Sequence, residues 1–270
     1  MRESENGARA GLAAMAFLPL AVGLLPLVAA GADDFRWQGR LAAGQAIEVK
    51  GVNGSIDARP AAGSEVEVTA VKRARRSNPD SVEVRVVEHG GGVTICAVYP
   101  SADGHRPNEC APGTAGRMNT RDNDVTVEFT VRVPAGVDFV GRTVNGEIEA
   151  RGLPGDAEAH TVNGAVVVEA AGHALARTVN GSIRATMGRA DWTGEAEFQT
   201  VNGSITLELP AGAGADVDAR TVNGGIDTDF PLTVSGRVSR RRLSGTIGGG
   251  GRKLSLETVN GGIHLQKARD

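Results

Sequence analysis

The chain has 270 residues, of which 38 are glycine and only 3% are aromatic, and its formal net charge is −3 at pH 7. The near-balanced charge excludes a general nucleic-acid-binding protein, which needs a basic surface, and glycine without a Gly-X-Y period excludes collagen. Because aromatic side chains usually dominate burial in a globular core, a core this poor in them must be assembled from Val, Ile, Leu and Ala. This composition predicts many turns and a thin, regularly layered architecture.

An apolar segment opens the chain. No charged residue occurs between Arg9 and Asp33, and the run ends in the small residues Ala30-Gly31-Ala32, which match an A-x-A cleavage site. This pattern is typical of a secretory signal peptide, here residues 1–32. The alternative is an uncleaved membrane anchor, because the run is long enough to span a bilayer. No second such run follows, so we expect an exported protein (periplasmic, cell-surface or secreted) whose mature chain does not span a membrane.

The sequence pattern of residues 33–140 is irregular. We expect this region to form the first coil or coils of the fold together with an N-terminal cap. Alternating, strand-like runs occur at Glu65–Lys72, Ser81–Glu88, Gly92–Tyr99 and Asp124–Val133. Between the last two runs lies a polar excursion, Pro100–Asp122, which is rich in Gly and Pro. Its Cys110 and the strand residue Cys96 are the two cysteines of the chain. In an oxidising compartment such a pair predicts a disulfide, worth about 3 kcal/mol for a loop of this size; the alternative is two unpaired thiols.

Residues 141–270 are dominated by a repeated string, Val-Asn-Gly-x-Ile or a close variant. Successive copies from Asn145 onward are spaced by 16 to 22 residues, which is the period of a single solenoid coil and is too short for a propeller blade. An eighth, degenerate copy is centred on Ser244, and most copies are preceded by Thr. The asparagines predicted to occupy the structural corners are Asn53, Asn145, Asn163, Asn180, Asn202, Asn223 and Asn260.

Asn-Gly also marks tight β-hairpins, so two geometries must be compared. In a two-residue hairpin at Asn145-Gly146, Val144 and Ile148 would lie on opposite faces of the sheet. If the chain only bends at Asn-Gly and continues onward, both apolar side chains can point inward, which favours a corner. Asn and Gly tolerate left-handed backbone conformations, and stacked asparagines can form a hydrogen-bonded ladder. We therefore predict an all-β fold, a single β-solenoid with Val-Asn-Gly-x-Ile corners.

The run Phe129–Gly136, followed by repeated Val-Asn-Gly-x-Ile, resembles the bacterial DUF4097 family, whose members carry the label of adhesins. The resemblance covers roughly residues 45–265. It implies a β-solenoid on an exported or envelope-associated protein, and it supplies no catalytic residues. The excursion between Cys96 and Cys110 departs from many relatives.

The expected function is that of a non-enzymatic cell-envelope protein, a binding, adhesin-like or scaffolding module whose partner is an unidentified envelope component, glycan or protein. One alternative is a regulatory or sensing partner in envelope stress. A second is an enzyme acting on polysaccharide, which would need two carboxylates in a groove; Asp156 and Glu158 with His160 are the candidates, but a solvated turn explains them better. We expect no cofactor and no metal site, because the histidines show no paired ligand spacing.

Overall fold

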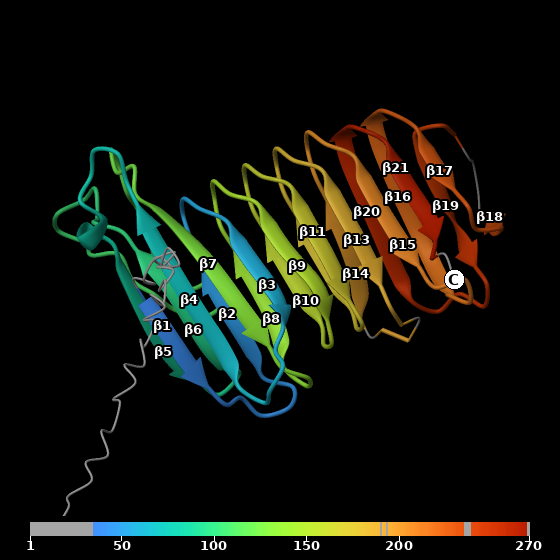
Figure 1. Cartoon of the computed structure of the whole chain (residues 1–270). Coiled ribbons are helices and arrows are strands. Elements are labelled where there is room, and N and C mark those ends of the chain that lie inside the picture. The colour runs from blue at the N-terminus through green and yellow to red at the C-terminus, as the bar shows by residue number, and fades with distance from the viewer. Residues whose placement is uncertain (1–34, 190, 193, 235–238, 269–270) are drawn as a thin grey trace, which may run out of the picture. The chain divides into compact units, whose positions relative to one another are not determined.

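Two long β-sheets face each other in the described part of the chain, and each regular coil between the two ends contributes one strand to each sheet (Figure 1). The structure is a computed structural model that describes residues 35–189, 191–192, 194–234 and 239–268. The predicted signal peptide, residues 1–32, lies outside these ranges. Within them, no helix has the length and apolar character needed to cross a membrane. The stacked parallel strands confirm the prediction of an all-β solenoid.

The first sheet, sheet A, has ten strands whose order in space differs from their order in the chain. In spatial order they are β1 (Phe35–Gly39), β4 (Val66–Arg73), β7 (Thr126–Val133), β3 (Ile56–Pro60), β9 (Ile148–Leu153), β11 (Val166–Ala170), β13 (Ile183–Met187), β15 (Ile205–Leu209), β21 (Ile263–Lys267) and β17 (Ile226–Thr228). All pairs from β7 to β17 are parallel, whereas β1 and β4 pair antiparallel at one end.

The second sheet, sheet B, has eleven strands. In spatial order they are β18 (Leu232–Val234), β19 (Arg242–Ile247), β16 (Ala215–Asn223), β20 (Lys253–Asn260), β14 (Glu195–Gln199), β12 (Ala174–Arg177), β10 (Ala157–His160), β8 (Asp138–Arg142), β2 (Ala46–Lys50), β6 (Gly92–Val98) and β5 (Glu83–His89). Antiparallel strands again lie at the ends, β5 at one and β18 with β19 at the other. A single 3-10 turn, η1 (Pro79–Ser81), precedes β5.

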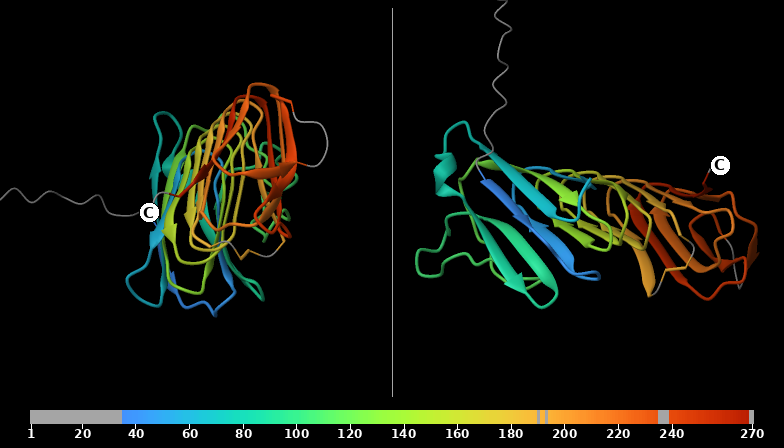
Figure 2. Two further views of the ribbon diagram at one scale, coloured as in Figure 1. Left: turned by 90° about the vertical axis from the view of Figure 1, so that its right-hand side faces the viewer. Right: turned by 60° about the horizontal axis from the view of Figure 1, so that its bottom comes forward.

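The view along the stack shows the two sheets lying face to face (Figure 2), and the buried side chains form a thin layer between their inward faces. Most strands alternate between buried and more exposed residues, because successive side chains of a strand point to opposite faces; β6, which is buried along its whole length, is an exception. In β11, Val166, Val168 and Ala170 are buried, while in β12 Ala174 and Ala176 face them from sheet B. Aliphatic residues therefore dominate the core, as the scarcity of aromatics predicted, although aromatic side chains such as Phe129, Phe139 and Phe198 are buried among them.

The order of the coils at the C-terminal end differs from the order of the repeats. The last coil, β20 and β21, lies between the coil of β14 and β15 and the coil of β16 and β17. Asn260 consequently stacks between Asn202 and Asn223. The predicted eighth corner at Ser244 is wrong: Ser244 lies within β19, opposite Asp218 in an antiparallel pair. Its segment forms the antiparallel end of sheet B, so the stack is not regular throughout 141–270.

Candidate binding surface

The asparagines of the repeated corners form one continuous column of side chains. In each step an Nδ2 donates to the Oδ1 of the asparagine in the preceding coil of the stack, over 2.7–2.9 Å. In stacking order the column consists of Asn53, Asn145, Asn163, Asn180, Asn202, Asn260 and Asn223. Backbone bonds accompany it, such as Asn163 N to Val144 O at 2.7 Å. The corner is thus held by both side-chain and main-chain ladders.

The corner glycines are required by close approach between coils. A Cβ added to the glycines of successive corners would lie 1.9–2.0 Å from the carbonyl oxygen of the corner glycine in the neighbouring coil. Among the corner residues that the structure describes, only Gly54 has a left-handed backbone (φ +123°), and none of the corner asparagines has one. The expectation that Asn-Gly serves here to adopt left-handed conformations is therefore wrong, because stacking distance is the constraint.

The orientation of the side chains at each corner also differs from the expectation. Five of the seven corner valines are exposed, with exposed fractions from 37% to 53%, whereas Val52 and Val259 are half-buried. The five are Val144, Val162, Val179, Val201 and Val222. The preceding threonines point inward and are at most 6% exposed: Thr143, Thr161, Thr178, Thr200, Thr221 and Thr258. Each threonine Oγ1 donates to a corner-glycine carbonyl of the adjacent coil over 2.9–3.2 Å. The corner therefore exposes a row of valines beside its amide column; we call the two together the corner ridge.

The inward threonines could have been predicted from the alternation of residues along each strand. Ala157, Ala159 and Thr161 are all buried, so the period of two in β10 simply continues into the corner. Thr precedes six of the seven Val-Asn-Gly copies. A buried hydroxyl at the end of a strand needs a nearby acceptor, and the neighbouring glycine carbonyl provides it.

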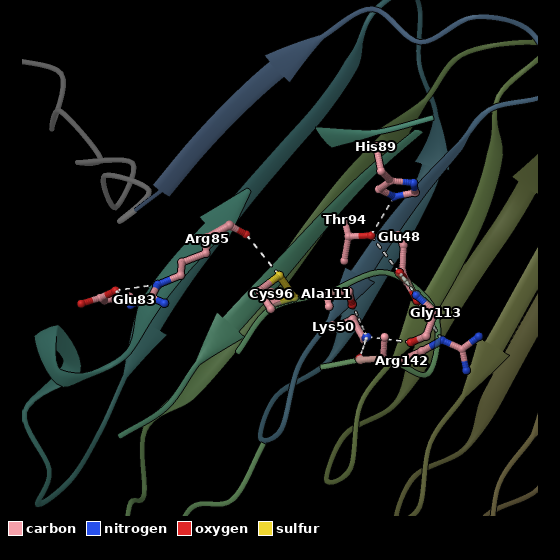
Figure 3. Close-up of a disulfide and its surroundings, with 12 residues drawn as sticks. Glu48, Lys50, Glu83, Arg85, His89, Thr94, Cys96, Ala111, Gly113 and Arg142 are labelled. Atoms are coloured by element: carbon pink, nitrogen blue, oxygen red, sulfur yellow. Dashed lines mark hydrogen bonds and ion pairs between the residues drawn. A yellow bond between two sulfur atoms is a disulfide. The ribbon is translucent and has the colours of Figure 1, made fainter. Parts of the chain in front are cut away.

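The excursion is fastened to sheet B close to the first corner (Figure 3). Cys96 in β6 and Cys110 form a disulfide with a Cα–Cα distance of 5.7 Å. Lys50 in β2 donates from Nζ to three carbonyl oxygens of the excursion, at 2.6 Å to Ala111, 2.7 Å to Gly113 and 3.2 Å to Ala115. Burial lowers the pKa of Lys50 from its usual value. Neither Lys50 nor its carbonyl partners carried a motif that sequence reasoning could detect.

Glu48, which is 5% exposed, is the acidic counterpart of this anchor. Its carboxylate accepts from the Gly113 backbone N–H and the Thr94 hydroxyl, each at 2.9 Å, and from Arg142 Nε at 2.9 Å. Arg142 also donates to Glu158 at 2.5 Å. The network therefore links the excursion to the regular coils and neutralises the charges that it buries (Figure 3).

The three residues considered for glycan hydrolysis do not form a catalytic pair. Glu158 and His160 are hydrogen-bonded neighbours on β10. This hydrogen bond is the largest cause that lowers the pKa of Glu158, and the nearby Arg142 lowers it further. Asp156 lies at the other end of the strand, where its Oδ1 accepts from His173 N at 2.8 Å. Both carboxylates are thus occupied by protein partners. In the described ranges no three side chains of His, Cys, Asp or Glu gather as a metal site would require.

A groove of about 350 Å³ separates the excursion from sheet B and reaches the corner ridge. Its walls include Thr114, Arg117 and Met118 of the excursion, and Arg142 and Val144 opposite them. Met118 is 37% exposed and Val144 is 39% exposed. Because Val144 belongs to both the groove and the row of valines, we treat the groove and the corner ridge as one candidate binding surface.

Comparison with known proteins places this architecture. Residues 143–266 match the Toastrack DUF4097 family. Similar solved structures are a putative cell adhesion protein from Clostridium sporogenes (11% identity, 87% of this chain and 99% of that chain, TM-score 0.44) and a putative adhesin from Bacteroides fragilis (10% identity, 87% and 96%, TM-score 0.28). No curated protein matches the chain. The family match runs from the Thr143 corner into β21, so the similarity to the Toastrack DUF4097 family lies in the repeat region.

Proposed function

We propose that the protein is an exported, non-enzymatic binding module of the cell envelope, adhesin-like or scaffolding in role. The observation that carries the proposal is the corner ridge, where the valines of four successive coils, from Val144 to Val201, stand exposed in line beside an amide column. Contiguous apolar side chains on a surface commonly mark an interaction site. The ridge ends at a groove whose apolar residues Met118 and Val144 continue it.

The charged residues around the ridge support binding rather than catalysis. Catalytic carboxylates need freedom to exchange protons with a substrate. Here Glu48 and Glu158 are engaged by Arg142, and Asp156 holds a turn of the backbone. Because these carboxylates have protein partners, the surface is better suited to recognition of a partner by shape and hydrogen bonding than to proton transfer.

The test is co-sedimentation of the purified protein with isolated peptidoglycan, with outer-membrane vesicles and with whole cells. Saturable binding to one fraction is expected, and Val179→Asp with Val201→Asp on the ridge should weaken it. The matched control is Val86→Asp, since Val86 is a similarly exposed valine (36%) of the edge strand β5, away from the ridge. Absence of saturable binding to every fraction would contradict an envelope-binding role and would direct the search to regulatory protein partners.

Export is tested separately, by N-terminal sequencing of the protein recovered outside the cytoplasm. A mature chain that begins at Asp33 is expected from the Ala30-Gly31-Ala32 site. A full-length chain recovered in the membrane fraction would instead indicate a retained anchor.

A further inference from the structure

On the other side of the corner ridge, sheet A carries a second groove, which crosses β11, β13 and β15 and has a volume of about 310 Å³. Its floor next to the ridge is formed by the small residues that follow the corner glycines, Ala165, Ser182 and Ser204. Arg184 and Thr206 line it two residues further along the strands, where they are paired in register. The repeat pattern itself therefore produces the hollow, because three successive coils place a small residue there.

The hydroxyl groups of this groove are available as donors. Ser182 Oγ accepts from Ser204 N at 3.2 Å, and Ser204 Oγ accepts from Gly262 N at 3.3 Å. A hydroxyl has one hydrogen to donate besides the lone pairs that accept. Since both oxygens act as acceptors toward the backbone, their hydrogens are free to bond to a ligand in the groove.

Two arginines line the groove, Arg151 and Arg184, and within the described residues no carboxylate pairs with Arg184. It is exposed on β13, and its neighbours at the same register are the uncharged Val167 and Thr206. The nearby Glu169 is bound by Arg151 at 2.7 Å. Other outward arginines of the coils do contact carboxylates at hydrogen-bond distance: Arg59, Arg142, Arg151, Arg177 and Arg220. Arg184 thus presents a guanidinium whose donors remain unused by the protein.

We infer that this groove binds an acidic glycan, with the carboxylate of one sugar on Arg184 and ring hydroxyls on Ser182, Ser204 and Thr206. A guanidinium holds a carboxylate through two parallel charge-assisted hydrogen bonds. The free serine hydrogens lie in the same groove and match a ligand rich in acceptors. No acidic residue lines the groove to repel such a ligand. This assignment rests on the proposed envelope-binding function, for which it names the ligand class.

The probe is an oligogalacturonate, compared by titration calorimetry with its fully methyl-esterified form, which keeps the rings and removes the charge. Arg184→Gln should lower the affinity for the acid about tenfold or more, as expected for loss of a charge-assisted pair, and should leave the melting temperature unchanged. Arg177→Gln is the matched control, because Arg177 is an exposed arginine of sheet B paired with Glu197. It should leave the affinity unchanged.

Equal binding of the acid and its ester, or no effect of Arg184→Gln, would overturn the assignment. Equally tight binding of a sulfated glycan or of a single-stranded oligonucleotide would also overturn it, since it would show attraction to polyanions in general. If the protein sediments with an envelope fraction but fails to bind the oligogalacturonate, the inference fails while the proposed function stands. If it binds neither, both fail.

Discussion

Replacement of one corner glycine, Gly203→Ala, tests the reason for the repeated Asn-Gly most directly. The new Cβ would lie 2.0 Å from the carbonyl oxygen and 2.5 Å from the carbonyl carbon of Gly181 in the neighbouring coil. Because both atoms belong to the backbone, relief requires the two coils to move apart by about 1 Å, which stretches hydrogen bonds beyond their useful range. Of the hydrogen bonds that cross this corner, three involve Gly181 or the asparagine column beside it: Gly181 N to Asn202 O (3.0 Å), Thr200 Oγ1 to Gly181 O (2.9 Å) and Asn202 Nδ2 to Asn180 Oδ1 (2.8 Å).

At about 1 kcal/mol for each bond, the substitution should cost about 3 kcal/mol. For a chain of this size that corresponds to a fall of about 6–12 °C in melting temperature, measured by circular dichroism. Gly212→Ala is the control, because a Cβ there meets nothing within 4 Å, and it should leave the melting temperature nearly unchanged. Equal melting temperatures for the two variants would refute the argument that coil spacing selects glycine.

Three further predictions concern single side chains. Burial raises the pKa of Tyr99, the one tyrosine of the chain, to about 12. Its protonated form therefore contributes to the free energy of unfolding below about pH 10, and this contribution is lost as the pH rises toward 12. Ultraviolet titration should show this midpoint in the folded protein and one near 10 in urea, and a folded-state midpoint near 10 would contradict the burial. Lys50→Met should remove the three carbonyl bonds that fasten the excursion, with faster amide exchange there and an intact disulfide; unchanged exchange would show that the disulfide alone fastens it. Thr200→Val should cost about 1–2 kcal/mol in denaturant unfolding by leaving the Gly181 carbonyl unpaired, whereas no cost would mean that the hydroxyl is dispensable.

Much of the fold could be predicted because its determinants are local and repeated. The period of the Val-Asn-Gly string indicates one coil per repeat, and alternation within segments such as Val166–Ala170 indicates strands with one buried face. The scarcity of aromatics indicated a core of aliphatic side chains. The corner, too, was predicted, although on the incorrect premise that Val144 and Ile148 both point inward: Val144 is exposed and Ile148 is buried.

The candidate binding surface was less accessible to sequence reasoning, since its parts depend on contacts between distant residues. Lys50 meets carbonyls 61 to 65 positions later in the chain, and nothing in its local sequence distinguishes it from a solvated lysine. Likewise, Arg184 resembles the paired arginines of neighbouring strands until the register places Val167 and Thr206 beside it. Only the stacking of coils decides which charges are neutralised.

The sequence by itself determined that this chain forms coils with an asparagine at one corner, because Asn-Gly spacing and strand alternation act within a single repeat. The tertiary structure alone decided the order in which the coils stack. Every coil presents the same ladder of amides and carbonyls at its corner, so Asn260 fits between Asn202 and Asn223 as well as it would follow the latter. Because the coils are repeats, each coil is predictable from the sequence, but the order in which the coils stack is not. The antiparallel end formed by β18 and β19 determines where the last coil lies.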